Sequence, residues 1–459
     1  MQIDFHRPMA VHFIGIGGIS MSGLAEILLK EGFRVSGSDR SESEILQSLR
    51  DKGAKVFVPQ AGENIPEDTE LCVYTAAIRE DNPEFIHAKE LGLPILSRAE
   101  LLGQIMSHYE DSIAVAGTHG KTTTTSMITE VLLAGDMDPT VTVGGMLSTI
   151  GGNIRVGRSS RFVAEACEYT NSFLSFFPKY TIITNVEAEH LDFFKDLADV
   201  RNSFHRFAGN TNADGAVIIN AGIPSYEEIV RGIPARVISY GIEEESDYRA
   251  GDIRFDEAGR ASFHVYRKKQ DMGEFSLGVP GVHNVSNALA VIALSEELSV
   301  PLPFIKEGLA SFGGADRRFQ LKGKTCGVTI VDDYAHHPTE IAATLEAAKR
   351  IPHNRLIVAF QPHTYSRTKA FLADFARVLS EADLVVLSDI YAAREKNTFG
   401  IHAKDLLAML KERGTESYYF PSFDEIEKFL LKKCMNNDLL ITMGAGDIYK
   451  VGENLLGKE

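Results

Sequence analysis

The chain has 459 residues, which is too long for one ordinary hydrophobic core, so we expect three domains. Its 44% hydrophobic and 24% charged residues are typical of a folded protein and exclude intrinsic disorder. The net charge of −16 would repel a phosphate polymer, so we expect no nucleic-acid partner.

The cysteines and the apolar segments indicate the compartment. The four cysteines lie far apart, which argues against a disulfide framework or a zinc ribbon and favours a reduced, cytoplasmic protein. No run of roughly 18 apolar residues occurs. Residues 1–9 do not resemble a signal peptide, so we expect no membrane insertion.

Short apolar runs alternate with amphipathic helical stretches along the chain, a pattern that predicts an α/β fold with parallel sheets. The pattern falls into three blocks, which we predict to be domains at 1–110, 111–314 and 315–459. A helix is expected at 98–108 and hairpins at 247–273. Four buried strands are predicted in the third block, at 328–332, 356–360, 384–387 and 439–442.

Ligands of open α/β sheets bind beyond the carboxyl ends of strands, and the first such end is rich in glycine. Glycines let the backbone approach a diphosphate, and a helix N-terminus supplies amide groups. The candidate residues are Gly15, Gly17, Gly18, Ile19 and Ser20, with Asp39 after the second strand as a ribose-binding acid. Because Ser20 stands where a dinucleotide motif has its third glycine, NAD, another nucleotide diphosphate and a turn without ligand all remain open.

The strand that begins the second block leads into a sharper motif, GTHGKTT at 117–123. This motif ends as a P-loop does and is followed by a helix. In a P-loop the backbone cradles phosphates, the lysine reaches their oxygens and the hydroxyl binds Mg²⁺. The candidate residues are Gly117, Thr118, His119, Gly120, Lys121, Thr122 and Thr123. Val115 occupies the position of the usual first glycine, so the loop is short, and an ordinary helix N-terminus is the alternative.

Ionisable residues follow two neighbouring strands of the same block. Glu165 and Glu168 come after one strand, and Glu189 and His190 come after the next. These side chains could hold one or two Mg²⁺ ions beside the P-loop, although His190 is the weaker candidate because Mg²⁺ prefers oxygen. Alone, each would be a solvated loop residue.

Three strand ends of the third block carry dense clusters of ionisable residues, at 332–338, 361–367 and 389–395. A single histidine is most often a core residue, but this density predicts a site for a small charged molecule. Its arginines would pair with a carboxylate.

These motifs together resemble those of the Mur ligase family of peptidoglycan synthesis, over essentially the whole chain and in the same order. The segments that carry the resemblance are 15–23, 117–123, 185–192, 280–287, 317–319 and 332–338. The short P-loop is the family's own form. The chain departs from the family pattern at Cys167-Glu168-Tyr169 and at Thr364.

The resemblance implies a Rossmann-like N-terminal domain for a UDP-sugar, a central P-loop ATPase domain and a Rossmann-like C-terminal domain. It implies that ATP, with Mg²⁺, phosphorylates the carboxylate of UDP-N-acetylmuramate, and that L-alanine attacks the acyl phosphate. By the same resemblance, Lys121 and Thr122 hold the ATP phosphates and metal, and Glu165 and His190 hold the Mg²⁺. The residues implied to bind the nucleotide are His283, Asn284, Asn287, Arg318 and Asp332, and those at the amino-acid site are Tyr334, His336 and Arg367. Arg394, in the cluster at 389–395, is a further candidate for binding the substrate. Lys121, His190, His336 and Arg367 are the expected catalytic residues.

Other functions remain as alternatives. One is a ligase that joins a ready-made tripeptide to the same UDP-sugar, against which Tyr334 and Glu340 are weak indications. Another is a nucleotide-binding regulator without ligase activity, whose expected mark, loss of Lys121, Glu165 or His190, is absent. An NAD dehydrogenase is disfavoured by Ser20 and by the P-loop. We expect a monomer or a homodimer.

Overall fold

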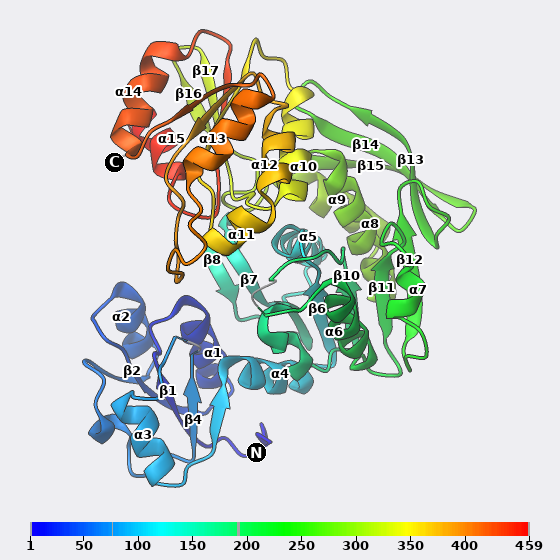
Figure 1. Ribbon diagram of the computed structural model, residues 1–459. Helices are drawn as coiled ribbons and strands as arrows, with labels where there is room; N and C mark the ends of the chain where they lie inside the picture. The colour runs from blue at the N-terminus through cyan, green and yellow to red at the C-terminus, as the bar shows by residue number, and fades with distance from the viewer. Residues whose placement is uncertain (1, 76, 191–192, 458–459) are drawn as a thin grey trace. The chain divides into compact units, whose positions relative to one another are not determined.

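The computed structural model describes residues 2–75, 77–190 and 193–457, and these form three separate β-sheets with helices between the strands (Figure 1). The predicted α/β class is confirmed. By its backbone contacts the chain forms two compact units: the first runs to Tyr240 and includes Ala290–Ile305, and the second comprises Gly241–Leu289 and the chain from Lys306 onward. Among the described residues, no helix is long and apolar enough to cross a membrane.

The first sheet, blue in Figure 1, has the order β3-β2-β1-β4-β5 with all strands parallel. Its strands are β1 (Ala10–Ile14), β2 (Arg34–Ser38), β3 (Lys55–Phe57), β4 (Leu71–Tyr74) and β5 (Ile95–Ser97). Its helices are α1 (Ile19–Lys30), α2 (Glu44–Asp51), η1 (Gly62–Asn64), α3 (Pro83–Glu90) and α4 (Arg98–His108). The strand order reverses at β1, so the glycine-rich loop after Ile14 lies at a topological switch point, where α/β sheets bind ligands.

The second sheet of the first unit has the order β12-β11-β10-β6-β9-β7-β8. Its strands are β6 (Asp111–Ala116), β7 (Thr140–Leu147), β8 (Gly152–Arg155), β9 (Arg161–Glu165), β10 (Tyr180–Ile183), β11 (Ala216–Asn220) and β12 (Arg236–Gly241). Its helices are α5 (Lys121–Ala134), η2 (Ser148–Ile150), η3 (Tyr169–Ser175), α6 (Leu197–Gly209) and α7 (Tyr226–Ile229). The central strands are buried on both faces, which explains their continuous apolar sequences. β6 has neighbours from later in the chain on both sides, so its carboxyl end is a second switch point.

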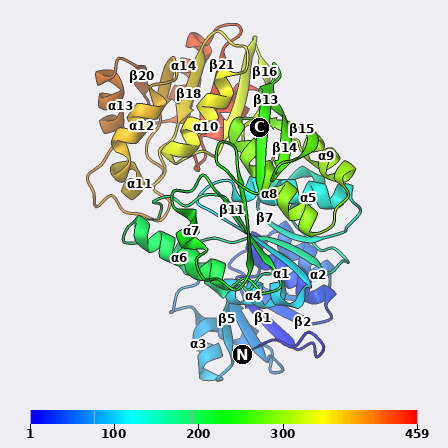
Figure 2. The same ribbon diagram turned by 90° about the vertical axis from the view of Figure 1, so that its right-hand side faces the viewer.

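The second unit begins with the predicted hairpins, which are confirmed as an antiparallel meander of three long strands, drawn in green in Figure 2. The elements of this region are β13 (Tyr248–Phe255), β14 (Arg260–Arg267), β15 (Gln270–Pro280), α8 (Val282–Glu297) and α9 (Leu302–Ser311). Alternating residues of β14 are buried, as expected for a sheet with one face in the core.

The third sheet has the order β16-β17-β21-β18-β19-β20, and only β16 is antiparallel to its neighbour. Its strands are β16 (Gln320–Thr325), β17 (Val328–Asp333), β18 (Leu356–Phe360), β19 (Leu384–Leu387), β20 (Glu416–Tyr419) and β21 (Leu439–Met443). Its helices are α10 (Pro338–Lys349), α11 (Tyr365–Ala370), α12 (Leu372–Leu379), α13 (Ala403–Glu412), α14 (Phe423–Lys433) and α15 (Tyr449–Leu455). Helices cover both faces, because Val358 packs in the core with Leu345, whereas its neighbour Ile357 packs with Ile426.

Candidate active site

The glycines of the P-loop are required by its backbone. Gly117 follows β6 with φ of +142°, and a Cβ atom there would lie 1.9 Å from Oγ1 of Thr184. Gly120 has φ of +81° and is the N-cap of α5. The loop therefore turns from β6 into α5 over residues 117–120. Val115, at the position where a standard P-loop has its first glycine, still belongs to β6.

We expect Gly117→Ala to abolish activity and to lower the Tm, because the new methyl group meets Thr184 in a backbone conformation that is strained for alanine. The expected cost is about 1–3 kcal/mol. Gly135→Ala is the matched control, since Gly135 has φ of −80° and its Cβ would meet no atom closer than 3.5 Å. Thermal unfolding and phosphate release of both variants test this, and equal behaviour would contradict it.

The loop after β10 holds the P-loop in place. The backbone N–H of His119 donates to Oδ1 of Asn185 at 2.7 Å, and Nδ2 of Asn185 donates to the carbonyl of His119 at 3.0 Å. Thr118 accepts a hydrogen bond at its hydroxyl from the N–H of Glu187 at 2.9 Å. The contacts of His119 and Thr118 thus hold the P-loop against the segment that follows β10.

Lys121 is the centre of a buried ion pair. Its Nζ donates to Oε2 of Glu168 at 2.9 Å, to the carbonyl of Thr118 at 3.2 Å and to the carbonyl of Gly117. Burial opposes the charges, but the Coulombic attraction outweighs it, so the pKa of Lys121 is raised and that of Glu168 is lowered. Glu168 is 2% exposed and also lies 3.6 Å from Nε2 of His190.

The two predicted oxygen ligands of Mg²⁺, Thr122 and Glu165, contact each other. The hydroxyl of Thr122 donates to Oε2 of Glu165 at 3.2 Å, and Oε1 of Glu165 accepts from the N–H of Gly144 at 2.6 Å. A hydroxyl beside a carboxylate is a donor set that fits Mg²⁺. His190 contacts Glu168, Thr123 is half-buried in the first turn of α5, and the motif residues 191–192 lie outside the described residues.

The first glycine-rich loop is fixed by the end of β2. The backbone N–H groups of Gly15 and Ile16 both donate to the carbonyl of Ser38 at 2.9 Å. The N–H of Gly17 donates to Oδ2 of Asp39 at 2.8 Å. The Asp39 carboxylate, predicted to bind a ribose, therefore already accepts a hydrogen bond from the loop itself.

The same loop opens α1. Gly18 is the N-cap of α1 and has an extended backbone, and Ile19, the first helical residue, is 58% exposed. The hydroxyl of Ser20 accepts a hydrogen bond from Nη1 of Arg98 at 3.0 Å. Sequence reasoning overlooked Arg98, although its position directly after a strand could have revealed it.

The three predicted clusters of the second unit do come together. The ring of His336 lies 5.7 Å from that of His363, which stacks on Tyr391 at 5.6 Å. Nη1 of Arg367 lies 2.9 Å from Nδ1 of His363, and the Tyr334 ring packs edge-on against His336. Residues after β17, β18 and β19 thus form one polar surface, as expected for carboxyl ends of parallel strands. Arg394 is exposed on the loop after β19.

Asp332 has a different setting from its neighbours. It is fully buried and accepts from Nε of Arg317 at 2.9 Å and from the hydroxyl of Thr442 at 2.7 Å. Burial raises its pKa although Arg317 opposes this shift. The guanidinium groups of Arg317 and Arg318 both lie over the ring of Tyr334, 4.9 and 5.2 Å from its centroid. Sequence reasoning assigned no role to Arg317, whose side chain also donates to two carbonyl groups, those of Gly444 and Gly446.

The side-chain amides of Asn284 and Asn287, in the motif at 280–287, have hydrogen-bond partners within the chain. Nδ2 of Asn284 donates to the carbonyl of Pro280 at 2.7 Å, and Nδ2 of Asn287 donates to Oδ1 of Asn284 at 3.1 Å. Nδ1 of His283 is buried without a hydrogen-bond partner among the described residues. Burial lowers the pKa of His283 from 6.5 to about 4. His283 is therefore a neutral ring at physiological pH.

We expect this histidine to make stability depend on pH. Because the folded pKa lies below the unfolded value, the unfolded chain takes up a proton first, and stability present above pH 6.5 is lost as the pH falls toward about 4. The loss is on the order of 1–3 kcal/mol. Tm measured across this range should fall more steeply for the native chain than for His283→Gln, and parallel curves would contradict the assignment.

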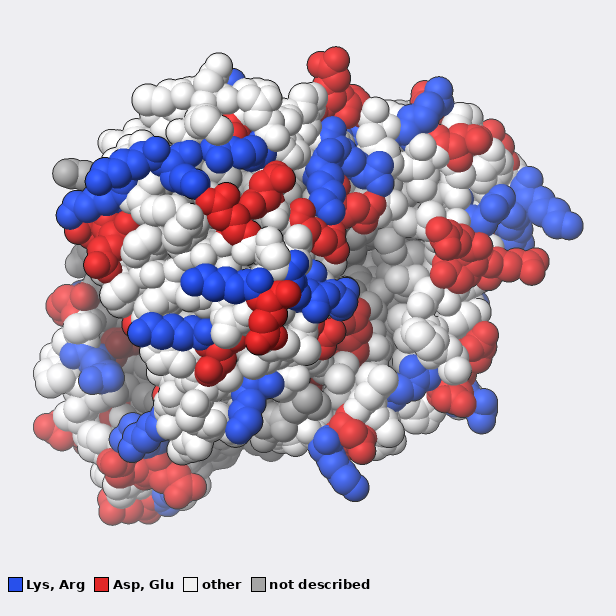
Figure 3. Space-filling view, turned by 45° about the horizontal axis from the view of Figure 1, so that its top comes forward, with Lys and Arg blue, Asp and Glu red and all other residues white. Residues whose placement is uncertain are grey.

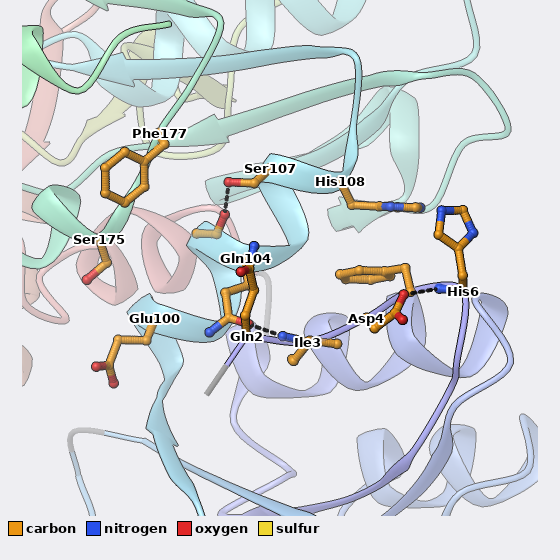
Figure 4. A pocket seen from close by; sticks show the side chains of 12 residues that line it. Gln2, Ile3, Asp4, His6, Glu100, Gln104, Ser107, His108, Ser175 and Phe177 are labelled. Carbon is orange, nitrogen blue, oxygen red and sulfur yellow. Dashed lines mark hydrogen bonds between the residues drawn. The ribbon is translucent and has the colours of Figure 1, made fainter.

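A separate cavity of about 520 Å³ lies in the first unit, between the N-terminal segment, α4 and the end of η3 (Figure 4). The N–H of Ile3 donates to Oε1 of Gln104 at 2.7 Å, and Phe5 stacks on His108. Phe177 projects at its rim. None of the predicted site residues lines this cavity.

Charge on the face drawn in Figure 3 is mixed, with lysine and arginine interspersed among acidic side chains. No broad basic surface is visible on that face.

The P-loop lies at the switch point of β6, with Glu168 bonded to its lysine and Glu165 bonded to its threonine. These features are those of an α/β protein of the P-loop class. Three family models match the chain: "Mur ligase family, catalytic domain" at 10–110, "Mur ligase middle domain" at 115–295 and "Mur ligase, glutamate ligase domain" at 317–446. The chain belongs to the Mur ligase family, as the motifs predicted.

Individual relatives show which members of the Mur ligase family the chain is similar to. The UDP-N-acetylmuramate–L-alanine ligase of Agathobacter rectalis is 62% identical over 457 residues, covering 100% of each chain. The crystal structure of a UDP-N-acetylmuramate–alanine ligase from Thermotoga maritima is 32% identical with a TM-score of 0.79, covering 98% of this chain and 99% of that one. A tripeptide-adding relative, the UDP-N-acetylmuramate:L-alanyl-γ-D-glutamyl-meso-diaminopimelate ligase from Neisseria, is 28% identical with a TM-score of 0.60, covering 68% of this chain and 100% of that one.

Proposed function

We propose that this chain is an ATP-dependent ligase that joins L-alanine to the carboxylate of UDP-N-acetylmuramate in peptidoglycan precursor synthesis. The observation that carries the proposal is the end-to-end 62% identity with an alanine-adding ligase, in a chain that retains the P-loop lysine. The tripeptide-adding relative is much less similar, at 28% identity.

The reaction needs activation because a carboxylate is a poor electrophile at neutral pH. A carboxylate oxygen attacks the γ-phosphorus of ATP and ADP leaves. The amino group of alanine then attacks the acyl carbon and phosphate leaves, giving an amide. Positioning and charge neutralisation supply most of the catalysis of such phosphoryl transfers.

Lys121 is the residue proposed to neutralise the transferring phosphoryl group. Its ammonium donates to the P-loop carbonyls of Gly117 and Thr118 and is kept charged by Glu168. Thr122, Glu165 and His190 are the proposed Mg²⁺ ligands, and the metal would neutralise phosphate charge when bound. The other P-loop residues bind phosphates through their backbone.

The remaining substrate sites follow the strand ends. We propose the loop from Gly15 to Ser20 as the site of the UDP-sugar. In the second unit, we propose Tyr334, His336 and Arg367 for the amino acid, with Arg394 as a further candidate. His283, Asn284, Asn287, Arg318 and Asp332 are proposed to complete the ATP site, Asp332 by holding Arg317 in place.

Domain boundaries at 1–110, 111–314 and 315–459 are part of the proposal, as are a cytoplasmic location and a monomeric or homodimeric state. The functional test is a phosphate-release assay with UDP-N-acetylmuramate, ATP and Mg²⁺, run with each free amino acid and with the tripeptide. Release that depends on alanine supports the proposal. Release that depends on the tripeptide alone would favour the recycling ligase, and none with any acceptor would favour a regulator.

A further inference from the structure

Arg98 lies at the same sheet edge as the first glycine-rich loop. It is the first residue of α4 and follows β5 directly, while the glycine-rich loop follows β1. β1, β4 and β5 are parallel neighbours, with Ile14 beside Tyr74 and Tyr74 beside Ser97. Both segments therefore leave the sheet at its carboxyl edge, and α1 packs against α4.

The guanidinium of Arg98 has a neutral partner but no anionic one. Nη1 donates to the hydroxyl of Ser20 at 3.0 Å. Within residues 2–75, 77–190 and 193–457, no carboxylate forms an ion pair with it. The side chain is partly buried, and it stands in the first turn of a helix, where the dipole disfavours a cation. A partly buried charge is costly without a counter-charge, so this position favours an anionic ligand.

Backbone amides beside this cation are available to such a ligand. The amides of Gly15, Ile16 and Gly17 are already bonded to Ser38 and Asp39. Ser20 lies in the first turn of α1. The backbone N–H groups at the start of a helix have no carbonyl partner within the helix, so they can bind an anion. The hydroxyl of Ser20 therefore brings the guanidinium to the amides that would face a diphosphate.

We infer that Arg98 binds the diphosphate of the sugar nucleotide and that Ser20 positions its guanidinium. The inference rests on the proposed function and deepens it, because it names a cation for a loop whose proposed residues, Gly15 to Ser20, carry none. It also explains why a serine stands where a dinucleotide-binding loop has its third glycine: the side chain has a partner to hold.

Calorimetric titration of the full chain with UDP-N-acetylmuramate, UDP and uridine tests this inference. Arg98→Ala should weaken binding of UDP-N-acetylmuramate and of UDP by roughly 10- to 100-fold, since charge-assisted hydrogen bonds are lost. Binding of uridine and of ATP should change little. Arg98→Lys should recover part of the affinity, and Ser20→Ala should lose less than Arg98→Ala.

Arg50→Ala is the matched control, because Arg50 belongs to the same sheet domain but is already paired with Glu42 at 2.8 Å. A native chain that binds no UDP-N-acetylmuramate would overturn the proposed function itself. A native chain that binds it, with Arg98→Ala binding equally well, would overturn only the role of Arg98. An equal loss for uridine and UDP, or a lowered ATP affinity, would show that Arg98 is structural.

Discussion

Replacing Lys121 by alanine should abolish ligation while leaving the affinity for UDP-N-acetylmuramate nearly unchanged. The lysine is the residue proposed to bind the ATP phosphates, and the loop proposed to bind the sugar nucleotide belongs to another sheet. We expect kcat to fall by at least about a thousandfold, because the charge opposite the transferring phosphoryl group is lost. Phosphate release measures the first effect, and calorimetric titration with UDP-N-acetylmuramate measures the second.

Controls for this variant must separate chemistry from folding. Truncation of Lys121 leaves the buried Glu168 carboxylate without its cation, which destabilises a fold. The double variant Lys121→Ala/Glu168→Gln removes that charge and should recover stability but not activity. Lys179→Ala, which breaks an ion pair with Asp111, is the matched control and should stay active. A large loss of UDP-sugar affinity in Lys121→Ala would show that the domain assignment is wrong.

Replacing Arg367 by alanine should raise the KM for alanine by roughly ten- to a hundredfold, since hydrogen bonds to charged groups contribute about 1.5–3 kcal/mol. Arg367 lies beside His363 on the polar surface where three strand ends meet. The acyl phosphate should still form, because its formation needs only ATP, Mg²⁺ and the muramate. Steady-state kinetics with each substrate varied in turn, and trapping of the acyl phosphate by borohydride, separate the two half-reactions.

Arg377→Ala is the control for this variant, because Arg377 is exposed and forms a local ion pair with Asp374, three residues earlier. It should leave every KM unchanged. If Arg367→Ala kept its alanine KM but lost affinity for ATP or the UDP-sugar, the amino-acid site would have to be reassigned. His336 and Arg394 would then be the next residues to substitute.

The elements and the P-loop were predictable because local chemistry determines them. Short apolar runs could be interpreted as buried strands, and β18 and β19 have the predicted bounds. The spacing of the glycines predicted a turn between a strand and a helix, and the structure has β6 ending at Ala116 and α5 beginning at Lys121. The phosphate-binding roles of Lys121 and Thr122 stay predictions. The clusters at three strand ends met as expected, because parallel strands present their carboxyl ends at one edge.

The contacts that could not be predicted depend on how distant segments pack. Glu168 was considered only as a metal ligand, and its ion pair with Lys121 joins residues 47 positions apart. The hydrogen bond between Arg98 and Ser20 spans 78 positions, so the sequence could show Arg98 at a strand end but not that it contacts Ser20. β16 was missed because its residues are mostly half-exposed and polar, which is typical of an edge strand rather than a buried one.

The central claim is that alanine is ligated through an acyl phosphate. The most direct measurement uses UDP-N-acetylmuramate whose carboxylate carries heavy oxygen, with ATP, Mg²⁺ and alanine, and mass spectrometry of both products. We expect the alanyl amide of the UDP-sugar, together with released phosphate that contains one heavy oxygen atom from the carboxylate. Phosphate without the label, or no amide formed with alanine, would contradict this account.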